Sequence, residues 1–553
     1  MLAALRRALR RPLVAGLALL LVYVALSFAM DTHGYLGTDT GGKVATLEAM
    51  KESGSFDVDL GYWAAQWDPT AKLHPEFNTT VVDGKFVNVT SVPMLIAAEP
   101  LYRLGGYRLA LLLPMLGAVA TAFACRAIAE RVRPGAGWPA FWIVGLASPM
   151  AIYALDFWEH SLGAALMCWG IVVVVDAVLD RPTVTRGLVA GLLFGAAFSM
   201  RTEAAAYAFV AVGLAALVIV LGRRRLPPVV TFGAAAAGAF AVVFALTSLL
   251  ERAVVGASIR GSRASGTAAA AGSTIDLRVR EGLATMVALR PDDSWQEIVF
   301  GVLVFGTLIA AVVAVKRGVR PEHRRIVVGA FALVAIFYLL RIYAVGLGFV
   351  PGFLAASPFA AAGLAAGWDN KASRTFMGIA VLALPIVWLF EFNGGAVPQW
   401  GGRYVLASCL VATAVGVAAA MAVDRRAVAL IAVLSVAITA LGVAWLGQRS
   451  RDIDVVGRDL VALKEPALIS SVGFFLREVG PRSLDRKWLS AGLPEDRQAA
   501  VDVMEKAGID EFAYLVDGDK PQLPSFDGWN LAGTRIYTWL NLPFTIATYD
   551  RAT

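Results

Sequence analysis

Charged side chains are scarce in this sequence of 553 residues. Asp, Glu, Lys and Arg together make up 16% of it, whereas hydrophobic residues make up 58%. Soluble domains carry about 25% charged and roughly 45–50% apolar residues. A shortage of charge on this scale excludes an ordinary soluble protein and predicts a polytopic membrane protein.

Cysteine is also rare. The chain has three, Cys125, Cys168 and Cys409, and each lies in or beside an apolar segment. This usage predicts neither a disulfide framework nor a cysteine metal site. The net charge of +7 could indicate a nucleic-acid partner. Lys and Arg fall mainly between apolar segments, however, which is the pattern of the positive-inside rule, so we expect no nucleic acid.

Long apolar runs dominate the first 446 residues. A span needs roughly 20 apolar residues, and by that measure the chain has about thirteen spans. The segments are 12–30, 108–125, 138–155, 161–179, 187–201, 204–222, 229–250, 297–315, 326–345, 352–367, 375–391, 404–422 and 427–446. The first run follows a basic start but lacks a convincing cleavage site, so it is predicted to remain as a helix.

Basic residues fix the expected orientation. Every second connection is short and rich in Arg or Lys, which predicts a cytoplasmic N-terminus. The loops 31–107 and 251–296 and everything after 447 then lie outside. The predicted fold class is an α-helical polytopic membrane protein in the cell membrane, N-terminus in and C-terminus out. Its expected domains are a transmembrane region, 1–446, and a small extracytoplasmic α/β domain, 447–553.

The loop 31–107 has predicted structure of its own. Residues 40–56 place Val44, Leu47 and Met50 on one side of a helix, which is expected to lie on the membrane surface. Residues 79–89 read as a β-hairpin around an Asp-Gly turn. In the C-terminal domain, 452–463 and 494–507 are predicted helices. The predicted strands there are 467–470, 511–516, 535–540 and 544–549.

Asp39 lies in the polar stretch that follows the first apolar run. The stretch 37–43 resembles a phosphate-binding loop, but Val44 replaces its Ser or Thr and no strand precedes it, so we reject a nucleotide site. In one interpretation, Asp39 caps the following helix. In the other, it is a general base that takes a proton from an attacking hydroxyl, with Asp31 as second candidate.

Two further polar clusters interrupt the spans. Residues 156–160 include Glu159 and His160, which either form a solvated corner or orient a phosphate or carboxylate. Residues 391–404 contain Gln399, Trp400 and several glycines, which allow a backbone to approach a ligand closely. Trp400 suits sugar stacking and the interfacial belt equally.

Three arginines lie at or within membrane segments. Arg201 pairs with its neighbour Glu203 or binds a lipid-linked phosphate, for which a guanidinium is well shaped. Arg341 either snorkels to the surface or contacts phosphate. Arg403 is a third phosphate candidate. A metal held by Asp39, Glu159 and His160 is an alternative that the pattern does not require, so we predict no metal ligands and no obligatory cofactor.

The layout resembles the multi-spanning membrane glycosyltransferases of the C class, which use polyprenyl-phosphate-linked sugars. The resemblance covers about 1–446 and is carried by Thr38-Asp39 after the first span, by 91–105, and by Gln399-Trp400-Gly401-Gly402-Arg403-Tyr404. The last run is similar to the Trp-Gly-Pro-Arg-Tyr run of bacterial relatives, with Gly402 in place of Pro. The Ala-, Arg-, Val- and Gly-rich composition resembles actinobacterial proteins, in which such enzymes build cell-wall and lipid glycans.

The resemblance implies transfer of a sugar, with inversion, from a lipid-linked donor to a hydroxyl of a cell-envelope glycan or glycolipid, with Asp39 as base. A single acidic residue followed by Thr departs from the Asp-Glu pair of protein mannosyltransferases, which disfavours a protein acceptor. Two alternatives remain at this stage. One is a lipid or solute transporter, although no paired repeats support it. The other is a membrane scaffold that recruits partners.

Overall fold

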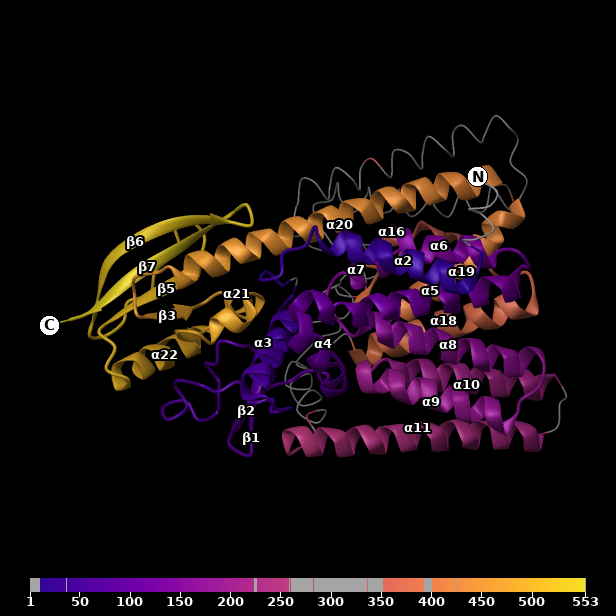
Figure 1. The fold of residues 1–553 in the computed structure, drawn as a ribbon, viewed down its shortest axis with the longest axis horizontal. Helices are drawn as coiled ribbons and strands as arrows, with labels where there is room; N and C mark the ends of the chain where they lie inside the picture. The colour runs from indigo at the N-terminus through magenta and orange to yellow at the C-terminus, as the bar shows by residue number, and fades with distance from the viewer. Residues whose placement is uncertain are drawn as a thin grey trace.

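The computed structural model describes residues 10–35, 37–222, 226–257, 352–391, 400–423 and 425–552, together with positions 259, 282 and 336. The described chain is mostly helical and ends in a sheet domain, which lies beyond one end of the helical bundle (Figure 1). The predicted spans 297–315 and 326–345 and the residues Arg341 and Gln399 lie outside the described residues.

Apolar helices form the bundle. Seven helices of the described residues are long and apolar enough to cross a membrane, and three shorter apolar helices, α2, α6 and α9, accompany them. The bundle elements are α2 (Pro12–Ser27), α4 (Val92–Ala110), α5 (Leu112–Val132), α6 (Gly137–Leu146), α7 (Met150–Tyr153), α8 (His160–Leu179), α9 (Val184–Met200), α10 (Ala204–Leu221), α11 (Leu226–Val255), α16 (Phe353–Ala356), α17 (Pro358–Ala366), α18 (Lys371–Glu391), the 3₁₀ turn η2 (Arg403–Val405), α19 (Leu406–Val423) and α20 (Arg425–Val461).

Small residues set the closest helix packing. Gly187, Gly191 and Gly195 recur every four residues along α9 and face α11. A Cβ at Gly187 would lie 2.3 Å from the carbonyl oxygen of Phe232, and one at Gly191 would lie 2.1 Å from that of Ala236. This small-residue spacing is typical of membrane helices, in which close backbone contact drives association.

The helix α3 (Thr38–Ser53) follows the first bundle helix. The sequence predicted a helix here, and the structure contains one. The prediction that its apolar face lies on the membrane surface is wrong, because Val44, Leu47 and Met50 have no exposed area and belong to the protein core. The predicted hairpin is present as β1 (Thr79–Val82) and β2 (Lys85–Asn88), which are antiparallel.

A five-stranded sheet with the order β4-β3-β5-β7-β6 organises the C-terminal domain. Its strands are β3 (Ala467–Ser470), β4 (Lys487–Ser490), β5 (Glu511–Asp517), β6 (Trp529–Trp539) and β7 (Leu542–Arg551). The neighbours β4, β3 and β5 are parallel, whereas β7 is antiparallel to β5 and to β6. The helices α21 (Gly473–Glu478) and α22 (Pro494–Lys506) and the 3₁₀ turn η3 (Gly480–Ser483) complete the domain.

Alternation along the strands creates two apolar faces. Ile469 faces the core that contains α22, whereas its neighbour Leu468 faces the core that contains α21 and the end of α20. The loop after α3 also takes part, because Ala64 and Leu73 belong to the α22 core. Part of the loop between the first two bundle helices therefore folds with the C-terminal domain.

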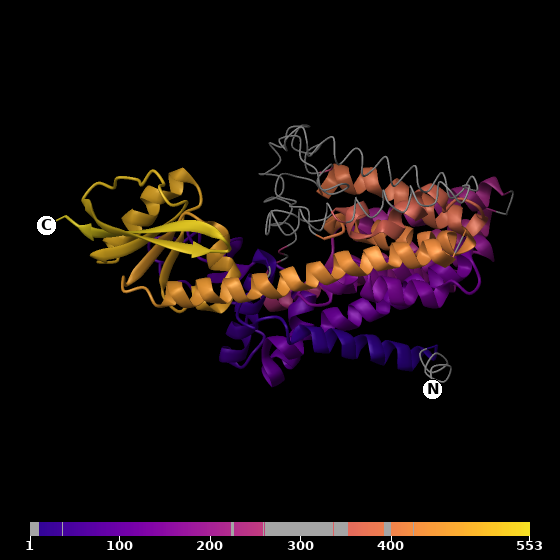
Figure 2. The same cartoon turned by 90° about the horizontal axis from the view of Figure 1, so that it is seen from above.

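The helix α20 joins the two regions. It runs without interruption over 37 residues, from the bundle into the C-terminal domain (Figure 2). Its first part is apolar, and its last turns place Ile453, Val456 and Leu460 in the domain core. The predicted domain boundary at 446/447 falls inside this helix.

Candidate active site

Asp39 lies in the first turn of α3, where a negative charge is favoured by the helix dipole. The N-cap residue is Gly37, so the interpretation of Asp39 as the cap is wrong. The side chain of Asp39 is 29% exposed and therefore can be reached from outside the protein core.

Two arginines from distant parts of the chain hold this carboxylate. Oδ2 of Asp39 accepts a hydrogen bond from Arg403 of η2, and Oδ1 lies 3.6 Å from Nη1 of Arg477 of α21. Burial alone would raise the pKa of Asp39, but the charges of Arg403, Arg477 and Lys43 hold it well below its usual range. Asp39 is therefore ionised and firmly paired in this structure.

Arg403 is surrounded by rings as well as by Asp39. Its Nε lies 3.3 Å from Nε2 of His160. Its guanidinium lies 5.5 Å from the ring centre of Trp158 and 5.3 Å from that of Tyr404, within the range of cation–π attraction. These contacts fix the weakly hydrated guanidinium of Arg403 beside the carboxylate of Asp39. In this position the guanidinium can also bind an anionic ligand.

A second ionic cluster lies beside the first, and its four side chains pair with one another. Lys43 of α3 is ion-paired with Glu159, whose other oxygen lies 3.3 Å from Nη1 of Arg201. Nε of Arg201 donates to Glu203 at 3.0 Å. All four side chains are buried. The Arg201–Glu203 pair expected from the sequence is present, and two carboxylates already occupy this arginine.

The segment from α7 to the start of α8 contains polar atoms that lack a protein partner. Among the described residues, the hydroxyl of Tyr153, Oδ2 of Asp156, Nε1 of Trp158 and Nδ1 of His160 are buried and accept or donate no hydrogen bond. A buried polar atom without a partner costs about 1–3 kcal/mol. The rings of Tyr153 and Trp158 pack against that of His160, with centroids 5.2 Å and 5.0 Å away. The arrangement suits a polar ligand.

Asp156 connects this segment to α3. Its Oδ1 accepts hydrogen bonds from Thr40 at 2.9 Å and from Tyr107 at 3.4 Å. Burial raises the pKa of Asp156 to about 6, against the opposing effects of its hydrogen bonds and of Lys43. The bond to Thr40 fixes α3 against the start of α8, so that Asp39 faces Arg403.

The structure brings most of the predicted site residues together. Asp39, His160 and Arg403 meet directly, and Glu159 and Arg201 form the neighbouring cluster. Trp400 lies apart from these contacts in the core, 2% exposed, with its ring 6.1 Å from that of Trp445 of α20.

Two residues of the site were missed from the sequence. Lys43 lies four residues after Asp39, so a helix places the two on one face, and this spacing could have revealed it. Arg477 comes from the C-terminal domain, 438 positions after Asp39 (477 minus 39), and no local pattern marks it.

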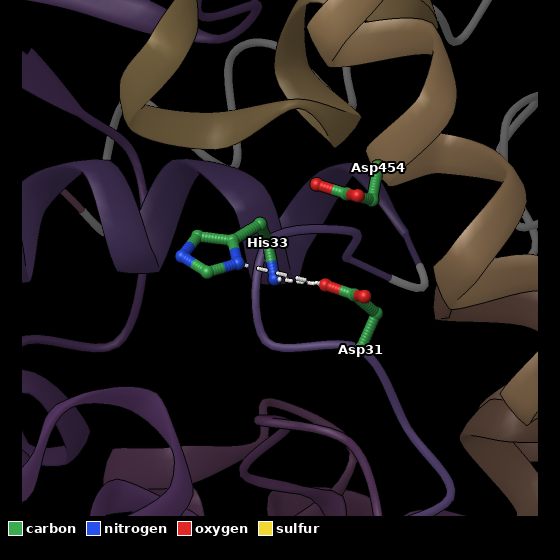
Figure 3. Close-up of side chains that lie close together, drawn as sticks. All are labelled: Asp31, His33 and Asp454. Atoms are coloured by element: carbon green, nitrogen blue, oxygen red, sulfur yellow. Dashed lines mark hydrogen bonds and ion pairs between the residues drawn. The ribbon is translucent and has the colours of Figure 1, made fainter.

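One candidate metal cluster exists among the described residues. Ligand atoms of Asp31, His33 and Asp454 lie within 4.8 Å of one another, and Figure 3 shows Asp31 and Asp454 beside the His33 ring. Both oxygens of Asp454 already pair with arginines, Oδ1 with Arg482 at 2.8 Å and Oδ2 with Arg458 at 3.0 Å. Two guanidiniums on one carboxylate disfavour a bound cation, and the other candidate set fits no better because Asp39 and Glu159 pair with Arg and Lys.

Comparisons with known proteins found no matching family model and no matching curated protein. The chain is similar in structure to ArnT from Cupriavidus metallidurans, both bound to undecaprenyl phosphate (TM-score 0.47, 12% identity) and in the apo state (TM-score 0.42, 14% identity). In each case, 97% of this chain and 97% of the other is covered. It is also similar to an Archaeoglobus fulgidus oligosaccharyltransferase in complex with Zn and sulfate (TM-score 0.44, 10% identity), covering 90% of this chain and 67% of that one. With TM-scores below 0.5, these likenesses alone assign neither a family nor an activity.

Proposed function

We propose that this protein is a membrane glycosyltransferase of the C class that transfers a sugar from a polyprenyl-phosphate-linked donor to a hydroxyl of a cell-envelope glycan or glycolipid. The observation that carries the proposal is the pair formed by Asp39 and Arg403. A partly exposed carboxylate lies against a guanidinium held by three rings, beside long apolar helices. A base and an anion-binding cation side by side at a membrane are what this transfer requires.

Arg403 is the proposed phosphate ligand. Arg201 is already shared between Glu159 and Glu203, whereas Arg403 has a single carboxylate partner among the described residues. The donor is a phosphodiester with one negative charge, and the departing polyprenyl phosphate gains a second. A fixed guanidinium therefore stabilises the transition state more than the bound donor, so no metal is needed for charge neutralisation. Arg341 and Gln399 keep their expected roles in substrate binding as part of the proposal.

Asp39 is the proposed general base. It takes the proton of the acceptor hydroxyl while the oxygen attacks the anomeric carbon, and the bonding pair of the broken C–O bond leaves with the lipid phosphate. A single displacement of this kind inverts the configuration. In the structure described here, both oxygens of Asp39 face arginines, which makes it a weak base. A donor phosphate that competes for Arg403 would free Asp39 and strengthen it.

The proposed reaction takes place on the face that the positive-inside pattern assigns to the cell exterior. The substrates enter where the bundle meets the C-terminal domain, since Asp39 is reached by residues of both. Trp158 and Tyr404 give the sugar aromatic neighbours.

The first test compares Asp39→Asn with Asp31→Asn in purified protein supplied with radiolabelled polyprenyl-phosphate sugars and a lipid extract. Asp39→Asn keeps the shape of the side chain but cannot take up the proton, so we expect transfer to fall by about 10²–10⁴-fold. Asp31→Asn is the matched control from the same loop. Its carboxylate accepts from the backbone N–H of His33, and we expect near-normal transfer.

The results separate the candidate functions. Full activity in Asp39→Asn together with loss in Asp31→Asn would move the base to Asp31. If the wild type transfers sugar from none of the donors but moves lipid across proteoliposome membranes, the protein is a transporter and the transferase proposal is wrong.

A further inference from the structure

A cavity of about 350 Å³ lies between the loop after α3 and the C-terminal domain. The segment 70–79 forms most of its wall, and Ser490, at the end of β4, completes the lining. Two contacts hold the wall in place: the backbone N–H of Ser490 donates to the carbonyl of Leu73 at 2.9 Å, and Lys72 is ion-paired with Asp496 of α22. In Figure 1 this loop is the indigo coil beside α22.

The lining combines one exposed ring with polar side chains. Phe77 is 56% exposed, and Glu76, Asn78, Thr70 and Thr79 share its segment. Residue types of this kind suit a saccharide, which presents an apolar C–H face and a rim of hydroxyls. The volume is in the range of ligand sites, about 300–1,000 Å³.

Glu76 has unused hydrogen-bonding capacity beside this cavity. It is fully buried, and its Oε1 accepts from Ser483 at 2.9 Å, whereas Oε2 has no partner among the described residues. Burial raises the pKa of Glu76 to about 8, against the opposing charge of Arg477 and the Ser483 bond. Because Glu76 has no exposed area, its carboxyl forms the wall of the cavity, and the side chains that a sugar hydroxyl can reach there include those of Thr70 and Asn78.

His74 shapes the wall rather than binding a ligand. Its Nδ1 accepts from the backbone N–H of Glu76 at 3.0 Å, and its Nε2 lies 3.1 Å from the carbonyl of Gly61. Burial lowers the pKa of His74 to about 4, so the ring is neutral at physiological pH. Both ring nitrogens of His74 are occupied, so its ring has no free nitrogen for a ligand.

Arg477 connects the cavity to the candidate active site. Its Nη1 lies 3.6 Å from Asp39, and its charge acts on Glu76. Its Nη2 donates to Asn88 of the hairpin at 3.3 Å. Arg477 thus lies against the proposed base and acts electrostatically on Glu76, a residue of the cavity lining.

We propose that this cavity, lined by Phe77, Glu76 and Ser490, is a saccharide subsite that binds the acceptor glycan of the reaction. The role of the bound saccharide as acceptor rests on the proposed transferase function, whereas saccharide binding itself does not depend on catalysis. The chemical class of the ligand is a neutral, hydroxyl-rich oligosaccharide.

The test measures binding and transfer separately. Full-length protein in nanodiscs is titrated with fluorescently labelled disaccharides of mannose, glucose, galactose and arabinose, and anisotropy reports binding. We expect Phe77→Ala to weaken binding of the preferred disaccharide about tenfold, which corresponds to about 1.4 kcal/mol. Thr70→Trp, at an exposed lining position, should abolish binding by filling the cavity.

Phe56→Ala is the matched control, because Phe56 is 46% exposed and lies outside the cavity lining. Its binding and its acceptor KM should equal those of wild type. In the transfer assay, Phe77→Ala should raise the acceptor KM about tenfold while kcat and the donor KM stay unchanged. Asp39→Asn should bind the disaccharide as wild type does.

The outcomes distinguish this subsite from the proposed function. Binding that is lost in Phe77→Ala, in a protein that transfers no sugar, would support a saccharide site and overturn the transferase. Transfer with an acceptor KM unchanged in both cavity variants would support the transferase and overturn the subsite. Absence of binding by every disaccharide at millimolar concentration would also overturn the subsite.

Discussion

The acid–base chemistry of Asp39 depends on how strongly its arginines hold it. One oxygen pairs with Arg403 and the other lies 3.6 Å from Arg477, while Lys43 is one turn further along α3. Burial would raise the pKa of this carboxyl, and the three cations lower it well below its usual range. A group held in this way is ionised at all working pH values but attracts a proton weakly. Its use as a base therefore requires that a ligand first weaken the pairing.

This competition predicts different pH dependences for the free enzyme and its donor complex. In the free enzyme, the pKa of Asp39 is so low that kcat/KM for the donor should show no acid limb from this residue. When a donor phosphate engages Arg403, the pKa of Asp39 should rise. The single-turnover rate at saturating donor should then show an acid limb, with an apparent pKa of about 4, the ordinary value for Asp, or higher.

Arg403→Gln provides the internal comparison for this pH experiment. Without the guanidinium, the pKa of Asp39 should be higher already in the free enzyme, so the acid limb should appear in kcat/KM. Donor KM should rise as well, because the phosphate loses its ligand. Identical limbs in kcat/KM and single-turnover rate of the wild type would contradict the competition.

The sequence was informative about single residues only where local chemistry marked them. Asp39, Arg403 and His160 were singled out because ionisable groups beside apolar spans are costly and tend to be functional, and they do meet. Of the two alternatives for Arg201, the pair with Glu203 is present, but the additional contact with Glu159, 42 positions away, could not be read from the sequence. Arg477 could not be predicted, because its approach to Asp39 depends on the docking of a separate domain.

At the scale of elements, α3 is the part of the molecule on which the site depends. It carries Asp39 and Lys43 on the side of the bundle, and it receives the C-terminal domain on another side. Gly41 makes this second contact possible. A Cβ at Gly41 would lie 1.6 Å from the carbonyl oxygen of Arg477, far inside any real contact distance.

Gly41→Ala should therefore separate the C-terminal domain from α3. The clash is with backbone, so the neighbour cannot simply rotate away, and overpacking of this kind typically costs about 1–3 kcal/mol. We expect a lower apparent melting temperature, faster proteolysis near α20 and a large loss of transfer, because Arg477 moves with the domain. Limited proteolysis and thermal scanning fluorimetry measure the first two effects.

Gly213→Ala is the control for this substitution. Gly213 also lies inside a helix, α10, but a Cβ there meets nothing within 4 Å. Ala has the higher helix propensity, by up to about 1 kcal/mol, so this variant should be as stable as wild type or more so. A Gly41→Ala protein as stable and as active as Gly213→Ala would show that the domain contact with α3 is not required.

Elements with a strong local pattern were predicted well, and those without one were not. The Asp-Gly turn identified the hairpin, and short apolar runs identified β3, β5, β7 and part of β6. The strand β4 was missed, because Lys487–Ser490 is a four-residue strand whose pairing depends entirely on its neighbour β3. The apolar face of α3 was detected, but amphipathicity cannot distinguish a membrane surface from a covering domain.

At the scale of the whole molecule, buried ionisable groups hold the C-terminal domain against the first loop and against α20. Glu76 of the loop accepts from Ser483 of η3, and Glu478 of α21 pairs with Arg449 of α20. Burial raises the pKa of both carboxyls. The junction that they form is therefore expected to be a pH-sensitive part of the fold. Composition and periodicity predicted the two regions, but not this junction, because it arises from tertiary contacts.

The direction of the pH effect follows from proton linkage. The pKa of Glu76 is about 8 in the folded protein, against 4.5 in a model peptide, so the folded state retains a proton that the unfolded state has lost. The contribution of this proton to the free energy of unfolding is complete below about pH 4.5 and is lost as the pH rises towards 8. His74 acts in the opposite direction, since its pKa is lowered from 6.5 to about 4, but its contribution is complete above pH 6.5.

Between pH 6.5 and 8, therefore, the contribution of Glu76 to stability changes with pH, whereas that of His74 does not. Across this window, the wild type should lose about 1–2 kcal/mol, because each pKa unit corresponds to 1.36 kcal/mol. Glu76→Gln cannot ionise and keeps an oxygen for Ser483, so its apparent melting temperature should fall less over the same window. Glu495→Gln, at an exposed position of α22, should follow the wild-type slope. If Glu76→Gln and wild type show the same slope, Glu76 is ionised in the folded protein, and the junction between loop and domain contains a charged carboxylate instead of a neutral one.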